Sequence, residues 1–187
     1  MLKALFFILL FIHVHHVSAQ PKFPPKKDYR IAVLGCLRQL EPAPALYQYT
    51  HLDADLALWI GDNIYSDTKD DPTFLEQNYQ KLAALPAFQQ LKAEVPFLAT
   101  WDDHDYGLNN AGGDYLIKTQ SKNIFRSFWD LTEIIPEKQP GIYYSQIKNI
   151  QGLQLQMIFL DPRYNRDPVR LDGKGDTLGE EQWKWLE

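Results

Sequence analysis

The chain has 187 residues, 45% of them hydrophobic and 13% aromatic, and a formal net charge of −5. This length fits one domain, and the aromatic content with well-mixed charges excludes a disordered chain. The acidic balance excludes a nucleic-acid binder that relies on a basic surface, so an anionic ligand would need local positive charge, such as a metal cluster.

The segment 1–19 has the pattern of a secretory signal peptide. Lys3 precedes a short apolar run, and the segment ends in small residues at Ala19. The run is too short to span a bilayer as a finished helix. We therefore expect cleavage after Ala19, a secreted, periplasmic or extracellular location, and no transmembrane anchor after cleavage; an uncleaved anchor is the alternative. The segment 20–29 is rich in proline and lysine and is interpreted as a linker to a domain over 30–187.

Apolar runs and helix-type spacings alternate along the domain. The predicted elements, in chain order, are a strand at 30–36, a helix at 43–51, a strand at 55–60, a helix that begins after the Asp71-Pro72 cap, a strand at 95–100, a helix at 115–130 and a strand pair at 141–148 and 153–160. The first two runs are typical of strands buried on both faces. This order predicts an α/β layered fold, and the two successive strands indicate a mixed sheet.

Side chains of the kinds that bind metals or phosphate follow each predicted strand. Cys36 ends the first strand, Asp62 follows the second, Asp103 and His104 follow the third, and Arg163 follows the last. In open α/β sheets ligands bind beyond the carboxyl ends of the strands. Carboxylates hold hard cations, imidazole can ligate or donate a proton, and arginine clamps phosphate through two hydrogen bonds. The sequence therefore predicts a site for metal and phosphate chemistry at one edge of the sheet.

Each motif also has a plainer interpretation when it is taken alone. Cys36 could be an inert core residue, 102–105 a solvated turn, 61–63 an ordinary turn and 161–163 a surface loop. Their positions after successive apolar strands favour the site. Tyr65 could reach the same ion as the carboxylate three residues before it, and a thiolate together with a phenolate favours iron over magnesium.

Taken in order, these motifs resemble the metallophosphoesterases, whose pattern is a strand ending in a metal ligand, then G-D-x-x, then G-N-H-[D/E]. They resemble more closely the PhoD-like alkaline phosphatase/phosphodiesterase branch. In that branch a cysteine ends the first strand, the second motif reads G-D-x-I-Y and the third reads T-W-D-D-H-[D/E]. The corresponding segments here are 34–36, 61–65 and 100–105, with further matches at 106–115, 141–143, 160–163 and 178–186.

The resemblance implies a metallophosphoesterase-type α/β sandwich that hydrolyses phosphate mono- or diesters with a metal-activated water at a binuclear site. It implies Fe³⁺ and calcium, or another divalent metal pair. It also implies a small-molecule, lipid or polymer phosphate ester as substrate, without specific nucleic-acid recognition. Cys36, Asp62 and Tyr65 would be iron ligands, with Asp62 bridging to the second metal. Asp103 would take the place of a metal-binding asparagine.

The remaining implied roles concern the transferring phosphate. His104 would stabilise or protonate it, and Arg163 would contact it. Asp102, Asn110 and Asp161 would support the site or contact phosphate.

Two departures from the family pattern stand out. Asp161-Pro-Arg163 replaces the more usual D-T-R, and the later G-D-x-H segment has no counterpart before Glu187. Thr177 and Glu180 form a capping-box pattern for a helix that stops after about two turns. We therefore expect the C-terminal part of the family domain to be missing. The alternative function is a non-catalytic fragment or secreted binding domain; a redox metalloprotein is disfavoured by the excess of carboxylates.

Overall fold

The computed structural model describes residues 28–40, 43–150, 152–168 and 172–187. The predicted signal peptide and all but the last two residues of the predicted linker lie outside these ranges, so both stay predictions. Within the described ranges, no helix combines the length and the apolar character needed to cross a membrane.

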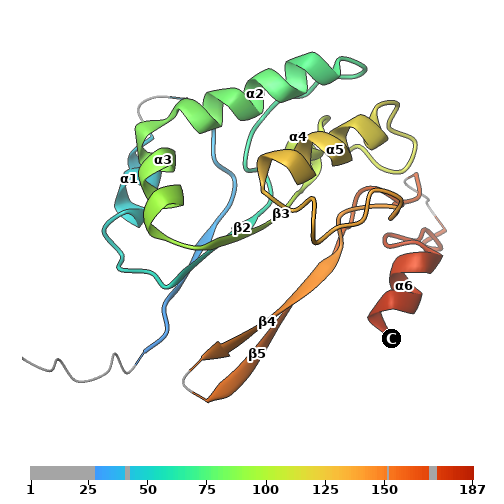
Figure 1. Ribbon diagram of the computed structural model, residues 1–187. Helices are drawn as coiled ribbons and strands as arrows, with labels where there is room; N and C mark the ends of the chain where they lie inside the picture. Colours follow the sequence, from blue (N-terminus) through green and yellow to red (C-terminus); the bar gives the residue numbers. More distant parts are fainter. Residues whose placement is uncertain (1–27, 41–42, 151, 169–171) are drawn as a thin grey trace, which may run out of the picture.

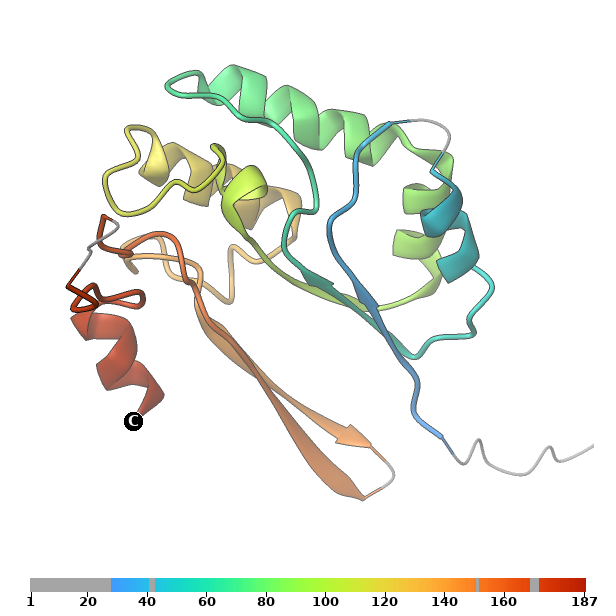
Figure 2. The same ribbon diagram turned by 180° about the vertical axis from the view of Figure 1, so that it is seen from behind.

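A three-stranded parallel sheet lies at the centre of the fold. Its strands, in spatial order, are β1 (Ile31–Leu34), β2 (Leu56–Ile60) and β3 (Phe97–Thr100). The connections carry α1 (Pro44–Tyr49), α2 (Pro72–Ala84) and α3 (Pro86–Glu94), and β3 is followed by α4 (Asp103–Tyr106) and α5 (Lys118–Phe128). Figures 1 and 2 show α1, α2, α3 and α5 on one side of this sheet. Because the strands are parallel, their carboxyl ends meet at one edge.

An antiparallel hairpin, β4 (Tyr144–Ile150) and β5 (Leu153–Phe159), follows and extends away from the helices (Figure 1). The short helix α6 (Glu180–Leu186) ends the chain. The predicted α/β fold with parallel and antiparallel strands is therefore confirmed. In the described residues the two strand types form separate sheets.

The prediction that the first strand is buried on both faces is wrong. β1 alternates between buried and exposed residues, with Ile31 37% and Val33 48% exposed, and Ile60 of β2 is 53% exposed. The physical reason is that the helices cover only one face of the sheet in the described residues (Figure 2). A continuous apolar run therefore does not by itself show that both faces are covered.

An aromatic core holds β2 against the helices. The ring centroid of Trp59 lies 5.5 Å from that of Phe88 on α3 and 5.2 Å from that of Trp129, which follows α5. Trp59 and Trp129 are each 2% exposed. Large aromatic side chains stabilise a fold through the apolar area that they remove from water, and tilted pairs of this kind add to that burial.

Of the two helix starts predicted from capping residues, one is confirmed and one is wrong. Asp71 accepts hydrogen bonds from Thr73 N and Phe74 N, so the predicted start of α2 is confirmed. The capping box predicted from Thr177 does not form, because α6 begins after Gly179 without a side-chain cap. Asp176 instead accepts from the N–H groups of Leu178 and Gly179. The helix α3 was not predicted.

The hairpin is tied to the carboxyl end of β3. Tyr144 Oη donates to Ala99 O at 2.9 Å and accepts from Ala99 N at 3.1 Å. Thr100 Oγ1 donates to Leu160 O at 3.2 Å. These bonds bring the segment after β5 to the edge where β1, β2 and β3 end, although that segment lies about sixty residues further along the chain.

Candidate metal and phosphate site

The loops after β1, β2 and β3 approach one another closely. Cys36 N donates to Gly61 O at 3.2 Å and Leu37 N donates to Asp62 O at 2.8 Å. Gly61 has φ +113°, and a Cβ there would lie 2.7 Å from the Cβ of Asp102. Only glycine fits both this left-handed backbone and this approach. The second loop is thereby held against the third.

The three predicted iron ligands, Cys36, Asp62 and Tyr65, lie close together. Asp62 Oδ2 lies 3.8 Å from Cys36 Sγ and accepts a hydrogen bond from Tyr65 Oη at 3.3 Å, while Asp62 Oδ1 is buried without a partner among the described residues. Cys36 and Asp62 both have φ +51°, which side chains other than glycine seldom adopt. Such backbone strain concentrates at functional sites. Cys36 is exposed, so its interpretation as an inert core residue is wrong.

Asp62, Asp103 and His104 form a cluster that could hold a cation. One potential ligand atom from each lies within 4.8 Å of the others. Burial, followed by the charges of Asp102 and Asp103, raises the pKa of Asp62. Carboxylates crowded in this way repel one another unless positive charge lies between them. Together with Cys36 and Tyr65, these three residues are called the mouth of the site below.

Asp103 has several neighbours within the protein. Its Oδ2 accepts from Asn110 N at 2.6 Å and lies 3.8 Å from Arg163 Nη2. Burial acts to raise the pKa of Asp103, but the Asn110 hydrogen bond and the positive charge of Arg163 outweigh it, so this pKa lies below its ordinary value. Asp103 is therefore anionic at neutral pH, the form in which a carboxylate binds metal. Asn110 contributes its backbone here, at φ +59°.

His104 is oriented by a residue to which the sequence analysis assigned no role. Its Nδ1 lies 2.8 Å from Asp67 Oδ1, which also accepts from Asn109 N at 2.9 Å. Ser66 Oγ donates to the backbone carbonyl of His104 at 2.9 Å, and the ring of Tyr65 lies 4.3 Å from the imidazole. A carboxylate on Nδ1 selects the tautomer and leaves Nε2 for a metal or a substrate oxygen.

Arg163 is held at the same edge by an ion pair. Its Nε and Nη2 lie 2.6 Å and 2.5 Å from Asp102 Oδ1. Its Nη1 is buried and has no partner among the described residues, and the whole side chain is 12% exposed. Burying a guanidinium N–H without a hydrogen-bond acceptor costs free energy, and a bound acceptor would remove that cost. Arg163 Nη1 is therefore a candidate donor to a bound anion.

Asp105 belongs to the same short motif as Asp103 but has a different environment. It is fully buried, and its Oδ1 accepts from the N–H groups of Asp62 and Asp102. Its Oδ2 accepts from Asn63 N and from Asn63 Nδ2, the latter at 2.6 Å. Burial raises the pKa of Asp105 against the effect of these donors. Both carboxylate oxygens of Asp105 thus join the loop after β2 to the loop after β3. The interpretation of residues 102–105 as a solvated turn is therefore wrong.

Asp161 plays a matching part for the last loop. It is fully buried, and its Oδ1 accepts from Trp101 Nε1 and from the N–H groups of Arg163 and Tyr164. Its backbone N–H donates to Gln182 Oε1. Complete burial is incompatible with a direct phosphate contact and with the surface-loop interpretation. Asn63, Asp105, Asp161 and Gln182 are called the floor of the site below.

The phenol of Tyr65 is protonated at neutral pH in the absence of a cation. Burial, then the neighbouring Asp62 and Cys36, raise its pKa to about 12. A phenolate at this position therefore requires a cation that reverses the local electrostatics.

The nine residues for which a metal, catalytic or supporting role was predicted all lie at this edge of the sheet, but in two layers. In the mouth or beside it lie Cys36, Asp62, Tyr65, Asp102, Asp103, His104, Asn110 and Arg163, and Asp161 lies beneath them in the floor. The pairing of Asp67 with His104 and the structural role of Asp105 were not predicted. A carboxylate partner for the His104 imidazole could have been expected, because such a partner orients the ring. The sequence does not show which of the nearby carboxylates it is.

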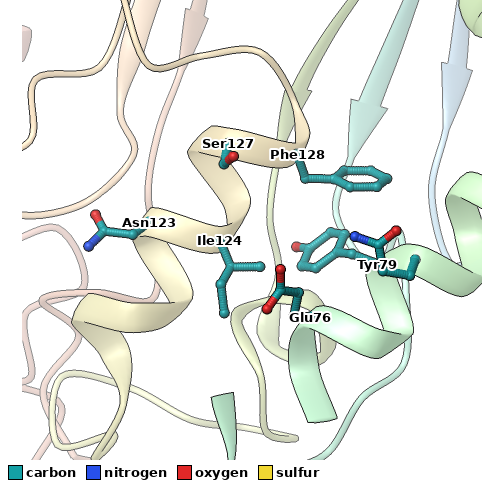
Figure 3. Close-up of a pocket in the computed structure, with 7 residues that line it drawn as sticks. Glu76, Tyr79, Asn123, Ile124, Ser127 and Phe128 are labelled. Atoms are coloured by element: carbon teal, nitrogen blue, oxygen red, sulfur yellow. The ribbon is translucent and has the colours of Figure 1, made fainter. Parts of the chain in front are cut away.

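A separate cavity of about 310 Å³ shares no lining residue with the mouth or the floor. It is lined by Glu76, Tyr79, Gln80, Asn123, Ile124, Ser127 and Phe128. Figure 3 shows it between α2 and α5, where the rings of Tyr79 and Phe128 approach with centroids 4.7 Å apart. Its lining contains no cation and one carboxylate, which suits neither phosphate nor a metal pair.

Comparison with known proteins gives one match in fold. A solved structure described as "Structure of PhoD" matches with a TM-score of 0.60 and 16% sequence identity, over 84% of this chain and 37% of that chain. This chain therefore spans little more than a third of the length of that protein. No protein-family model and no curated protein matches the sequence. At this identity the likeness concerns the fold alone: the matched part of the chain has a PhoD-like α/β fold.

Proposed function

We propose that this chain carries the metal- and phosphate-binding edge of a secreted phosphoesterase. The observation that carries the proposal is the convergence on Asp62. Its Oδ2 lies next to a thiol and a phenol, its Oδ1 is buried and unpartnered, and it shares a cluster with Asp103 and His104. The motif resemblance to the PhoD-like branch and the PhoD-like fold support the same reaction class.

The donor set fits a pair of cations. Asp62 would bridge them, Cys36 and Tyr65 would complete a site suited to Fe³⁺, and Asp103 would serve the second site, for which calcium or another divalent metal is proposed. The chemistry supplied by such a pair is Lewis-acid polarisation of phosphoryl oxygens and a lowered pKa for a coordinated water.

The chain's own residues would bind and orient the substrate. Arg163, fixed by Asp102, offers its free Nη1 to a phosphoryl oxygen. His104, fixed by Asp67, presents Nε2 to stabilise the transferring phosphate or to protonate the leaving oxygen. The floor holds the backbone of the loops after β2, β3 and β5, so these groups are positioned before the substrate arrives.

The deciding experiment measures hydrolysis of p-nitrophenyl phosphate and bis-p-nitrophenyl phosphate together with metal content. Asp62→Asn should lower turnover by at least about a hundredfold and reduce bound metal, because an amide cannot bridge two cations as a carboxylate does. Asp172→Asn, in an exposed loop, is the matched control and should leave both unchanged.

His104→Ala separates catalysis from metal binding. It should lower turnover more than metal content, since the proposed role of the imidazole is toward the phosphate. An equal loss of metal in the Asp62 and His104 variants would show instead that His104 is a ligand.

A second candidate function is a secreted binding domain that holds metal or phosphate without turnover. The acidic cluster and the thiol and phenol beside Asp62 would serve such a binding role as well. Metal binding that depends on Asp62, with no hydrolysis of either ester above that of the Asp62→Asn variant, would favour this candidate over the enzyme.

A further inference from the structure

A small cavity of about 190 Å³ adjoins the mouth at Tyr65. It is lined by Arg38, Gln39, Leu40, Tyr65, Asn78 and Lys81. Tyr65 thus lines the cavity while its hydroxyl donates to Asp62. The described residues of the lining include two cationic side chains and no carboxylate, in a chain whose net charge is −5.

The two cations are available to a ligand. The Arg38 guanidinium lies over the Tyr65 ring, 5.5 Å from its centroid, and no described residue accepts a hydrogen bond from it. Lys81 Nζ donates to Asn78 Oδ1 at 3.1 Å, which uses one of its three N–H groups. Both side chains belong to exposed residues, so solvated ions can reach them.

The base of the cavity is held by buried amides. Gln39 is 6% exposed and Asn78 is 3% exposed. Gln39 Nε2 donates to Tyr65 O at 2.8 Å and to Asn78 Oδ1 at 3.0 Å, and its Oε1 accepts from Tyr65 N at 2.9 Å. The side chain of Gln39 therefore fixes the loop after β1, the loop after β2 and α2 relative to one another. The base of the cavity is thus fixed by buried side chains, whereas Arg38, Leu40 and Lys81 at its sides are exposed.

We infer that this cavity is a subsite for a second phosphate group of the substrate. A guanidinium, which can donate two parallel hydrogen bonds, and an ammonium line one small cavity whose described residues include no carboxylate. This is the recognition chemistry for phosphate. The inference rests on the proposed function, because the cavity adjoins the mouth where the reacting phosphate would bind. It assigns the substrate class as phosphate esters that carry a further phosphate close to the scissile one.

The binding test is independent of catalysis. Metal-free protein is titrated with inorganic pyrophosphate by calorimetry, and the variants are Arg38→Gln, Lys81→Gln, their double variant and Lys174→Gln. The double variant should raise the Kd at least about tenfold, because charge-assisted hydrogen bonds to phosphate are lost. Lys174 lies in the exposed loop before α6, so its variant should bind like the wild type. Equal weakening by all variants, or none by the double variant, would overturn the subsite.

A kinetic test follows if the protein turns over phosphate esters. The double variant should raise KM for a bisphosphate ester at least about tenfold while leaving p-nitrophenyl phosphate hydrolysis unchanged, since the second ester has no group for the cavity. Equal effects on both esters would contradict the subsite but not the proposed function. Loss of turnover in the Asp62→Asn variant tests the proposed function and says nothing about the subsite. If the wild type shows no turnover, the pyrophosphate titration alone decides whether the subsite exists.

Discussion

The floor and the mouth of the site use the same side-chain types for opposite purposes. In the floor, Asp105 and Asp161 are fully buried, and backbone and side-chain N–H groups surround their carboxylates. In the mouth, one oxygen of Asp62 is buried without a partner in the described part of the chain, and the other oxygen accepts hydrogen bonds from a thiol and a phenol. Saturated carboxylates hold a backbone in place, whereas unsaturated ones can take a cation.

The difference also explains why the two layers need each other. The backbone N–H groups of Asp62 and Asp102 donate to Asp105. A floor carboxylate therefore positions Asp62, which would hold metal, and Asp102, which holds Arg163. Mutations in the floor should therefore lower the free energy of unfolding, whereas mutations in the mouth should weaken ligand binding.

The largest effect is expected from Asp105→Ala. It leaves the backbone N–H groups of Asp62, Asn63 and Asp102 and the Asn63 side-chain amide without their acceptor, so unfolding free energy should fall by at least about 3 kcal/mol. Chemical denaturation of metal-free protein measures this. Asp62→Ala is the matched mouth variant and should cost far less. A metal-free Asp62→Ala protein destabilised as much as Asp105→Ala would remove the distinction between floor and mouth.

Cys36→Ser tests the mouth without disturbing the fold. The thiol is exposed and its hydrogen bonds within the described residues are to Asp62 and Tyr65, so the metal-free variant should unfold at the same denaturant concentration as the wild type. Affinity for Fe³⁺ should fall at least about tenfold, because a neutral hydroxyl replaces a thiolate ligand. Iron titration followed by absorbance measures this, and unchanged affinity would reduce the cysteine to a surface residue.

Gly141→Ala tests the floor through its backbone neighbour. Gly141 has φ +114°, and a Cβ there would lie 2.5 Å from Asp161 Oδ2, so a loss of about 2 kcal/mol in unfolding free energy is expected. Gly152→Ala is the matched control. Gly152 has φ +89° but no atom within 4 Å of the added Cβ, so it reports backbone strain alone. Equal losses in both variants would mean that the approach to Asp161 adds nothing.

The smallest effect is expected at Asp176, outside both layers. The Trp183 Nε1 hydrogen bond, with those from the N–H groups of Leu178 and Gly179, lowers its pKa below the ordinary 3.8. A folded-state pKa that is lowered contributes stability above the unfolded value, and that contribution is lost as pH falls through the folded value. Asp176→Asn should therefore destabilise the protein slightly at pH 7 and progressively less below about pH 4. Thermal unfolding at pH 7 and pH 3 checks this; a deficit that grows toward pH 3 would contradict the sign.

The sequence by itself determined the elements that depend on local chemistry. The Asp71-Pro72 start of α2, the hairpin around Gly152 and the glycine after β2 all follow from backbone preferences of single residues or pairs. The placement of the candidate site also followed from sequence, because parallel strands must end at one edge and each strand end was marked by a polar residue.

Tertiary structure decided what each polar residue does there. Asp103 and Asp105 are two positions apart and chemically identical, yet α4 turns one toward Arg163 and the other into the backbone of the neighbouring loop. The pairing of Asp67 with His104 and the exposure of one face of β1 depend on which distant segments are packed alongside. Spacing along the chain carries no such information, because burial and partner choice are properties of the assembled layers.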